Sequence, residues 1–495
     1  MKYFLLTIIF VLNSISLLAQ SITAKIIDEN TKLPIPYAAV KIDDFNGVIS
    51  NEEGFFTLNS KNIEQITITC LGYKSKTLSL NELKSNNNII VLEESINELN
   101  TVFISNKRPN ADSIISRVRK RLSENYDIKL YKHEVFSRET AYVEFENLNF
   151  EVEKASHIKK KNLELANTSL DSLTKAIINS KTIHFKDFKG DLYLNGSQET
   201  KLVVHKATEL LDQKNNLSFE DVQKKGENIM LKYLDTTLTY KLKSGLFKIE
   251  DSLSLKDNSS KEMDKNEYQT NDLRGTVNSI LELSQFGENS TLLTILDDDS
   301  YDYTLLDISN YNNELIYVIG FKPDRSRSKY SGKLYVTDDN YAITKADIEF
   351  AEGKRGEKFN LKLLLGVKYI ENIFKVTLIY RKNAENKYEL QYAKNEEGSY
   401  FYVSRPLKFI ENSPQKNKTS FDFTIEGNII GKKELLFTSS DKISVDEYES
   451  IKTDKTVPYI KLNKYDPTIW GEDRTLEPLE EMKQFDATKE KVNNL

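Results

Sequence analysis

The chain has 495 residues, and its 69 Lys and Arg nearly balance its 75 Asp and Glu, for a net charge of −6. No basic stripe interrupts this mixture, which argues against a nucleic acid as partner. A single cysteine cannot form an internal disulfide, so burial has to stabilise the fold. Tyr (26) and Phe (24) are abundant, whereas Gly, Pro, Met and Trp are scarce, and this composition favours β-structure with aromatic faces.

Residues 1–20 have the pattern of a secretory signal peptide. Lys2 supplies the positive charge, an apolar run follows from Tyr3 to Leu12, and Ala19 offers a small residue for cleavage. No cysteine follows directly, so we do not expect a lipid anchor at the mature N-terminus. No later run of about 18 uncharged apolar residues predicts a transmembrane helix.

Residues 21–104 carry the most specific pattern in the chain. Apolar residues alternate with polar ones in several short runs, such as Ile22, Ala24 and Ile26. Turn residues separate these runs, and short strands with regular turn signals are typical of a β-sandwich. Cys70 falls at an inward-facing position, where it is expected to be a buried small hydrophobe and not a reactive thiol.

This order of motifs resembles the carboxypeptidase-regulatory-like domain, a transthyretin-like β-sandwich that opens many secreted and outer-membrane proteins of Gram-negative bacteria. The residues that carry the resemblance most clearly are Pro34, Gly54, Phe55, Phe56, Gly72 and Tyr73. The resemblance implies a seven-stranded-type sandwich without catalytic activity, used for folding, docking or spacing. With the signal peptide, it implies a protein of the periplasm or one associated with the outer membrane.

A polar, proline-broken linker is predicted at residues 105–110, followed by a large domain at 111–460 and a tail at 461–495. Within the large domain, helices are expected after a cap at Asn110 or Asp112, around residues 163–177 and around residues 273–281. The basic face of the first helix could meet solvent or anionic lipid. Residues 257–271 are predicted to form a charged loop. In the tail, Trp470 could anchor the chain end or contact a partner.

From residue 315 onwards, repeated alternation predicts an antiparallel meander. Its segments are expected at residues 315–321, 332–337, 341–350, 374–380, 388–392, 401–403 and 421–425. A β-bulge near Lys345 would reconcile two alternation parities. The unit Gly332–Phe350 resembles the hairpin of periplasmic lipoprotein-carrier-like proteins, whose curved sheet wraps helices or an apolar ligand. The predicted fold class is therefore mainly β, a sandwich followed by a larger β-rich α+β domain with a curved meander and a few helices.

No catalytic, cofactor-binding or metal-binding residue is predicted. His133, His157, His184 and His205 lack the spacing of a zinc site. The run Asp297 to Asp299 lacks the spaced ligands and glycine of a calcium loop, and is expected to be a solvated turn. No nucleophile elbow, P-loop or dinucleotide fingerprint is present.

The leading hypothesis is a non-enzymatic envelope protein whose sandwich serves docking or spacing and whose larger domain binds an apolar ligand or an outer-membrane partner. A hydrolase of peptide or glycan that uses carboxylates assembled by the fold is one alternative. A structural component of the envelope or of a surface assembly is another. The sequence leaves the ligand or partner surface, the partner's identity and the oligomeric state open.

Overall fold

The computed structural model describes residues 21–486 apart from residues 44–45, 60–62, 96–108, 127–129, 157, 180–181, 197–198, 212–226, 229, 246, 256–266, 289, 312–313, 384 and 472–474. The predicted signal peptide, most of the predicted linker and His157 therefore lie outside the described residues. The described chain is mainly β and contains two small sheets of an N-terminal sandwich, one large sheet and one short two-stranded sheet.

The N-terminal sandwich is built as predicted. One sheet has the order β4 (Phe55–Asn59), β1 (Ser21–Asp28) and β7 (Ile89–Leu92), and the other has the order β3 (Gly47–Ile49), β2 (Ala39–Lys41), β5 (Gln65–Thr69) and β6 (Lys76–Ser79). The alternating residues Ile22, Ala24 and Ile26 point into a shared core with Phe56 and Leu58. A short helix, α2 (Leu80–Ser85), follows β6 and starts with a capping box.

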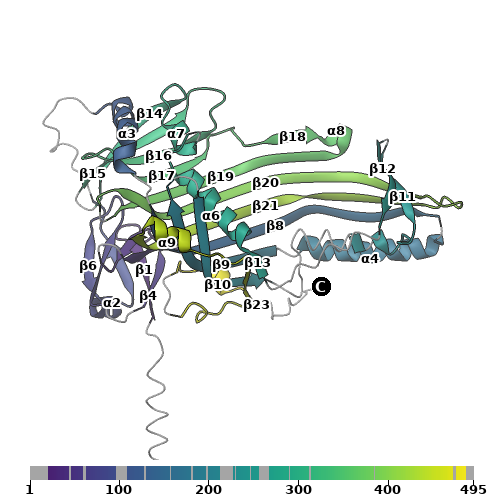
Figure 1. The fold of residues 1–495 in the computed structure, drawn as a ribbon, viewed down its shortest axis with the longest axis horizontal. Coiled ribbons are helices and arrows are strands. Elements are labelled where there is room, and N and C mark those ends of the chain that lie inside the picture. Colours follow the sequence, from purple (N-terminus) through teal and green to yellow (C-terminus); the bar gives the residue numbers. More distant parts are fainter. Residues whose placement is uncertain are drawn as a thin grey trace, which may run out of the picture.

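The large sheet has fourteen strands in the described chain (Figure 1). Its main order is β14 (Tyr301–Tyr311), β15 (Glu314–Pro323), β16 (Tyr330–Thr337), β17 (Ile343–Phe350), β19 (Val367–Lys382), β20 (Tyr388–Glu411), β21 (Lys418–Lys442), β8 (Tyr131–Ala155), β9 (Thr182–Asn195), β10 (Glu199–Leu211) and β23 (Ile460–Leu462). Three strands lie off this path: β11 (Thr239–Ser244), β12 (Phe247–Ser254) and β18 (Lys358–Leu361).

Three central strands, β8, β20 and β21, have 25, 24 and 25 residues and extend well past their neighbours. We call their outer parts, together with the start of β19, the blade (residues 143–155, 367–373, 399–411 and 418–429). Figure 1 shows the blade reaching away from the sandwich, with α4 (Lys160–Asn179) lying along it. Ile177 of α4 packs with Val143, Phe145 and Leu148 of β8, so the helix buries one apolar face of the blade.

The body of the large sheet is covered by α3 (Ala111–Asn125), α6 (Thr270–Ser284) and α7 (Thr291–Ile295). The Asn110 side chain caps α3 by accepting a hydrogen bond from the Ser113 N–H (3.0 Å), which confirms the predicted cap. Ile114, Ile115 and Val118 are buried in the common core. The remaining helices are α8 (Lys362–Leu365), α9 (Val445–Ser450) and α10 (Glu480–Lys483).

The predicted bulge near Lys345 is confirmed, because the pairing of β16 with β17 shifts between Tyr335 and Val336 and skips Thr344. The predicted loop at residues 257–271 is wrong over its described part. Residues 267–269 form β13 (Glu267–Gln269), which pairs with β22 (Thr456–Pro458), and α6 begins at Thr270. The pairing with a distant strand satisfies the backbone of this polar segment, which its composition could not indicate.

Candidate functional site

A pocket of about 420 Å³ lies in the body of the large domain, between the C-terminal ends of α3 and α6 and the central strands of the large sheet. Four aromatic side chains, Tyr126, Phe286, Tyr380 and Tyr388, form much of its wall. Leucines of α3, α6, β9 and β20 and Phe437 of β21 contribute most of the remaining apolar surface. A concave, mostly apolar cavity of this size is the usual form of a small-molecule site.

The amphipathic pattern of α3 places Tyr126 at the pocket. Its backbone N–H donates to the Leu122 carbonyl (2.9 Å) and closes the last turn of the helix. Leu122 and Tyr126 are four residues apart, so both side chains lie on one side of the helix. The Tyr126 ring lies 4.4 Å from Phe286 and 5.5 Å from Tyr380, centroid to centroid, and the rings form a continuous aromatic wall.

The phenols of this wall are held by backbone carbonyls. The Tyr126 hydroxyl donates to the Ile343 carbonyl (2.6 Å), and the Tyr380 hydroxyl donates to the Ser284 carbonyl (2.5 Å) at the end of α6. Burial raises the pKa of both phenols, so both are neutral at physiological pH. The first bond ties the end of α3 to β17, and the second ties the end of α6 to β19.

His133 of β8 adds a polar group to the pocket lining. Its ring lies between Tyr131 (5.8 Å) and Phe437 (5.1 Å), and its Nδ1 has no hydrogen-bond partner among the described residues. Burial, and next the positive charge of Arg381, lower the pKa of His133 to about 3. The imidazole is therefore neutral at pH 7 and suits the polar end of an otherwise apolar molecule.

Glu389 is the only carboxylate among the described residues that line the pocket. It accepts hydrogen bonds from Arg381 Nε (2.9 Å) and Ser440 Oγ (2.9 Å), in a pair that is mostly buried. Glycoside hydrolysis of the usual kind needs two carboxyl groups flanking the bond that breaks. The pocket therefore has one structural ion pair where such a hydrolase would have two free acids.

His184, His205 and Asp297, for which no metal site is predicted, contact other residues of the chain. His184 Nε2 lies 3.0 Å from Glu209, and His205 Nε2 lies 3.1 Å from Asp191. The Asp297 carboxylate accepts a hydrogen bond from the Ser300 hydroxyl (2.6 Å), which builds a turn. In the described part of the chain, no three His, Cys, Asp or Glu residues gather as metal ligands would. No helix there is long and apolar enough to cross a membrane.

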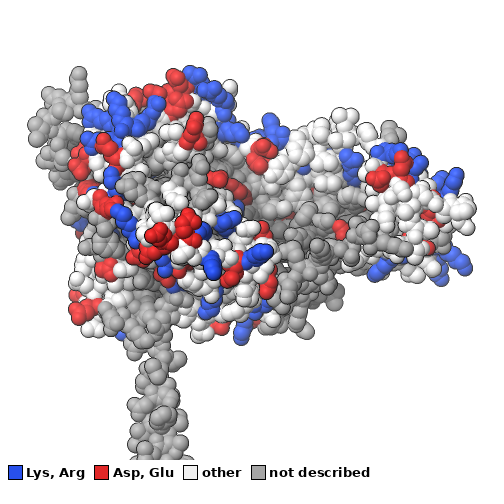
Figure 2. All heavy atoms as spheres, viewed as in Figure 1, with Lys and Arg blue, Asp and Glu red and all other residues white. Residues whose placement is uncertain are grey.

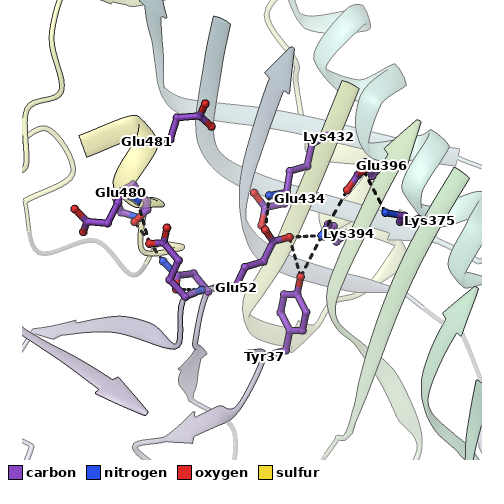
Figure 3. Close-up of polar contacts among 12 residues, drawn as sticks. Tyr37, Glu52, Lys375, Lys394, Glu396, Lys432, Glu434, Glu480 and Glu481 are labelled. Carbon is purple, nitrogen blue, oxygen red and sulfur yellow. Dashed lines mark hydrogen bonds and ion pairs between the residues drawn. The ribbon is translucent and has the colours of Figure 1, made fainter. Parts of the chain in front are cut away.

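The sandwich contacts the large sheet through its turn at residues 51–54, which we call the docking turn (Figure 3). Glu52 extends from this turn to Lys394 of β20 and to Lys432 of β21, whose Nζ lies 2.9 Å from its carboxylate. The Tyr37 hydroxyl also donates to Glu52 (3.0 Å), and the Tyr37 ring packs on Tyr392 at 5.4 Å. One carboxylate thus joins two strands of the sheet to the sandwich.

Both lysines of this junction are largely buried, since 14% of the Lys394 and 8% of the Lys432 side chain is exposed. Burial alone would raise the pKa of Glu52, but its hydrogen bond to Lys394 and the charge of Lys432 lower it to about 2. Glu52 is therefore ionised and is the carboxylate that both buried cations share, while Lys394 also lies 3.9 Å from Glu396.

The C-terminal tail holds the docking turn from its other side. The Asn51 side-chain amide donates to the carbonyls of Glu477 and Pro478 (both 3.2 Å), and the Glu53 carboxylate accepts from the Glu480 N–H (3.0 Å). Trp470 is buried with its ring 5.2 Å from Phe136, so the predicted tail anchor is confirmed. The sandwich is therefore fixed to the large domain by two separate segments.

The glycine corners of the sandwich have the backbone that only glycine adopts readily. Gly54 has φ +77°, and a Cβ there would lie 2.6 Å from the Ile26 carbonyl oxygen. Gly72 has φ +84° and precedes Tyr73, which bridges to Glu94. Pro34 forms a bridge with Ile27 of β1, the strand that precedes it. These residues shape the sandwich and are not among those that line the pocket.

The two phenylalanines and the cysteine of the sandwich have different roles. Phe56 is buried in the core, whereas the Phe55 ring lies beneath the ammonium groups of Lys25 (4.7 Å) and of Lys483 from the tail (4.9 Å). Cys70 packs against the sandwich core. Burial raises the pKa of its thiol to about 11, so the thiol stays protonated at neutral pH.

Sequence reasoning missed the pocket and the docking turn. An available signal for the pocket was the aromatic residue that follows each of two amphipathic helices, Tyr126 after α3 and Phe286 after α6. In the sequence, only Gly54 of the docking turn stands out, as a residue of the family motif. The pairing of Glu52 with lysines more than 300 positions away has no local signature.

Residues 22–104 match the CarboxypepD_reg-like domain family, which confirms the N-terminal domain predicted from the motifs. The match covers about one sixth of the chain, and it includes the docking turn and both glycine corners. A search of curated proteins finds no match to the chain.

Proposed function

We propose that this protein is a non-enzymatic, exported protein of the periplasm or outer membrane that binds one apolar ligand in the pocket of its large domain. The observation that carries the proposal is the cavity of about 420 Å³ with an aromatic wall, neutral phenols and a neutral imidazole. Such a lining favours an apolar molecule with one weakly polar end, because an ionised group would lose its hydration without a charged partner.

The sandwich has a docking role within this proposal. Its Glu52 joins two central strands of the sheet that also line the pocket farther along their length. A rigid junction of this kind suits a module that holds the large domain at a set orientation to an envelope partner. The resemblance of Gly332–Phe350 to the hairpin of lipoprotein-carrier-like proteins supports the same class of ligand.

Two alternatives are less well supported. A hydrolase would need a pair of available carboxylates, and Glu389 is held by Arg381 and Ser440. A structural component of the envelope would not need a pocket with an unpartnered imidazole nitrogen, although the fixed sandwich would fit that role.

The test combines co-purification with a pocket variant. The full mature chain is purified without detergent, extracted and analysed by mass spectrometry, and its binding of cis-parinaric acid, a fluorescent fatty acid, is titrated. Gly287 lies at the exposed mouth of the pocket, and an added Cβ would meet no atom within 4 Å. Gly287→Phe should therefore occupy the mouth without a clash and weaken probe binding about tenfold.

Gly275→Phe is the matched control, because Gly275 is exposed on α6, has equal space around its Cβ and does not line the pocket. The control should bind the probe as the native chain does. If the native chain carries no apolar molecule and both variants bind the probe equally, the ligand proposal is wrong and the docking role remains.

A further inference from the structure

A cluster of exposed apolar side chains stands on the edge of the blade, far from the pocket. It consists of Phe359, Leu361, Leu363 and Leu364, with relative exposures of 47%, 39%, 102% and 77%, and we call it the distal tip. Single exposed leucines are common on protein surfaces, but four large apolar side chains within six residues form a patch. Among the described residues, Leu363 is the most exposed large apolar side chain.

The backbone of the blade holds the distal tip in place. Phe359 of β18 pairs with Tyr369 of β19, and α8 ends at Gly366 with φ +63°. The Gly366 carbonyl accepts a hydrogen bond from the Ser404 N–H (2.8 Å), and a Cβ on Gly366 would lie 1.9 Å from the Ser404 carbonyl oxygen. The leucines are therefore displayed by a fixed turn.

The distal tip lies at an edge of the protein where an extended surface, such as a membrane, could contact it. Figure 1 shows β18 and α8 at the edge of the blade, on the side away from the sandwich and from α4. Figure 2 shows mostly uncharged atoms over α8. Farther along the blade, β11 pairs with β20 at residues 407–411, and its partner β12 exposes Phe247 (55%) and Ile249 (54%) next to the charged Lys248 and Glu250.

Cations and aromatic rings lie next to the exposed leucines. The segment from residue 358 to 370 contains Lys358, Lys362 and Lys368 and no acidic residue. The ammonium of Lys362 lies 3.7 Å from the Tyr402 ring centroid, and that of Lys368 lies 4.7 Å from the Tyr400 ring centroid. This arrangement suits a bilayer surface, where leucines contact the acyl chains and tyrosines and lysines contact the glycerol and phosphate groups above them.

The basic face of α3 differs from the tip in this respect, although its sequence also allowed a lipid contact. Arg117 donates to the Tyr341 hydroxyl, and Arg119 pairs with Asp298 (2.9 Å). The apolar side of α3 is buried in the core. Arg117 and Arg119 thus have partners within the chain, and the apolar face of α3 is buried, whereas the distal tip combines cations with exposed leucines.

We propose that the distal tip docks on the surface of an anionic phospholipid bilayer. Leu361, Leu363 and Leu364 would insert at the boundary between headgroups and acyl chains, and Lys358 and Lys362 would contact the lipid phosphates. The proposal does not depend on a ligand in the pocket, since the two sites share no residue.

The test is co-sedimentation of the full mature chain with vesicles of phosphatidylglycerol and phosphatidylcholine, compared with vesicles of phosphatidylcholine alone. Binding should be about tenfold tighter to the anionic vesicles and should weaken as salt is raised. The double variant Leu363→Ser/Leu364→Ser should lose about tenfold or more of the affinity, because two leucines no longer leave water.

Leu33→Ser/Leu165→Ser is the matched control, because both leucines are exposed (64% and 61%) outside the tip. It should bind vesicles as the native chain does. The charge variant Lys358→Glu/Lys362→Glu should abolish the preference for anionic lipid. Equal vesicle binding by the native chain and the leucine variant would overturn the proposal. A dimer that the leucine variant dissociates, in a chain that does not bind vesicles, would also overturn it and assign the tip to a second copy.

Discussion

Strand β20 passes through two regions, one in which charged side chains are buried and one in which apolar side chains are exposed. At Lys394 it lies under the sandwich, and a lysine is mostly buried against Glu52. At Ser404 it supports the distal tip, where leucines are exposed. The junction buries charge and the tip exposes apolar surface, which reverses the usual distribution at both places.

The difference follows from where the chain supplies its own partner. At the junction, the docking turn brings the Glu52 carboxylate to both buried lysines, and the tail supplies carbonyl acceptors to the Asn51 amide of the same turn. At the tip, no described segment of the chain packs over Leu363 or Leu364. A buried charge or an exposed apolar cluster therefore indicates a contact. At the junction the contact is within the chain, and at the distal tip we propose that it is with a membrane.

The largest expected effect concerns His133, a buried titratable group that lacks the charged partner found at the junction. Its pKa is about 3 in the folded chain against 6.5 as the ordinary value. Between these values the unfolded chain binds the additional proton, so stability is lost as the pH falls from 6.5 towards 3. At about 1.4 kcal/mol per pKa unit, the full loss is on the order of 5 kcal/mol.

The variant His133→Phe should lack this part of the pH dependence. The measurement is the free energy of unfolding of both proteins in denaturant at several pH values. As the pH falls below 6.5, the stability of the native chain relative to the variant should decrease, because only the native chain carries the buried imidazole. A constant difference between them across this range would show that His133 is not buried in its neutral form.

The next effect concerns the junction itself. Glu52→Gln removes the carboxylate that Lys394 and Lys432 share and leaves Lys394 only the more distant Glu396 at 3.9 Å, so we expect a loss of about 3 kcal/mol of stability. In the native chain, the contribution of Glu52 is complete above pH 4.5 and is lost as the pH falls towards 2, because its folded pKa is lowered. Thermal unfolding measures the loss, and Glu29→Gln, at an exposed turn of the sandwich, serves as control.

A smaller effect is expected at the corner that shapes the docking turn. Gly54→Ala places an alanine in a left-handed backbone conformation and its Cβ 2.6 Å from the Ile26 carbonyl oxygen. We expect a loss of about 2 kcal/mol in the free energy of unfolding. Gly72→Ala has the same backbone strain, but its nearest neighbour is Ser309 Oγ at 3.8 Å. It should cost about 1 kcal/mol, and equal losses in the two variants would mean that the clash at Gly54 is relieved by a small shift.

The smallest effect is predicted at the tip. Leu363→Ser/Leu364→Ser should change the free energy of unfolding by less than about 0.5 kcal/mol, since both side chains are exposed. Denaturant unfolding in the absence of lipid measures this change. A large loss would mean that these leucines pack within the protein, and the contrast between tip and junction would then disappear.

The sequence predicted those features whose pattern is local. The sandwich, the cap of α3 by Asn110, the helices at residues 163–177 and 273–281 and the bulge near Lys345 all depend on spacing within a few residues. Strand β20 was expected as two short runs. It is continuous because the polar side chains of its middle have partners: Lys394 pairs with Glu52, Glu396 pairs with Lys375 of β19, and Glu397 accepts a hydrogen bond from Asn395 of β20 itself. Alternation therefore fails there without ending the strand.

The pocket could not be predicted for a related reason. Its wall combines the end of α3, the loop after α6 and strands from two distant parts of the chain. Each aromatic residue has an ordinary core explanation by itself, and only the packing of two helices on the sheet leaves space between them. Tyr388 and Leu390 were correctly placed in the meander, but their contact with a cavity depends on Phe286, more than 100 positions earlier.

The attachment of the tail to the docking turn constrains the order of assembly. Glu53 and Glu480 are 427 positions apart, so their hydrogen bond closes a loop that spans nearly the whole chain. The sandwich has its own core and is synthesised first, whereas the strands and the tail that bind Asn51 and Glu52 arrive late. Its docking edge carries Ile49 and Tyr37 beside the polar docking turn, and these two side chains pack with Tyr392, Trp470 and Leu476 only in the complete fold. The early domain therefore keeps a partly apolar surface in contact with water until the last segment of the chain covers it.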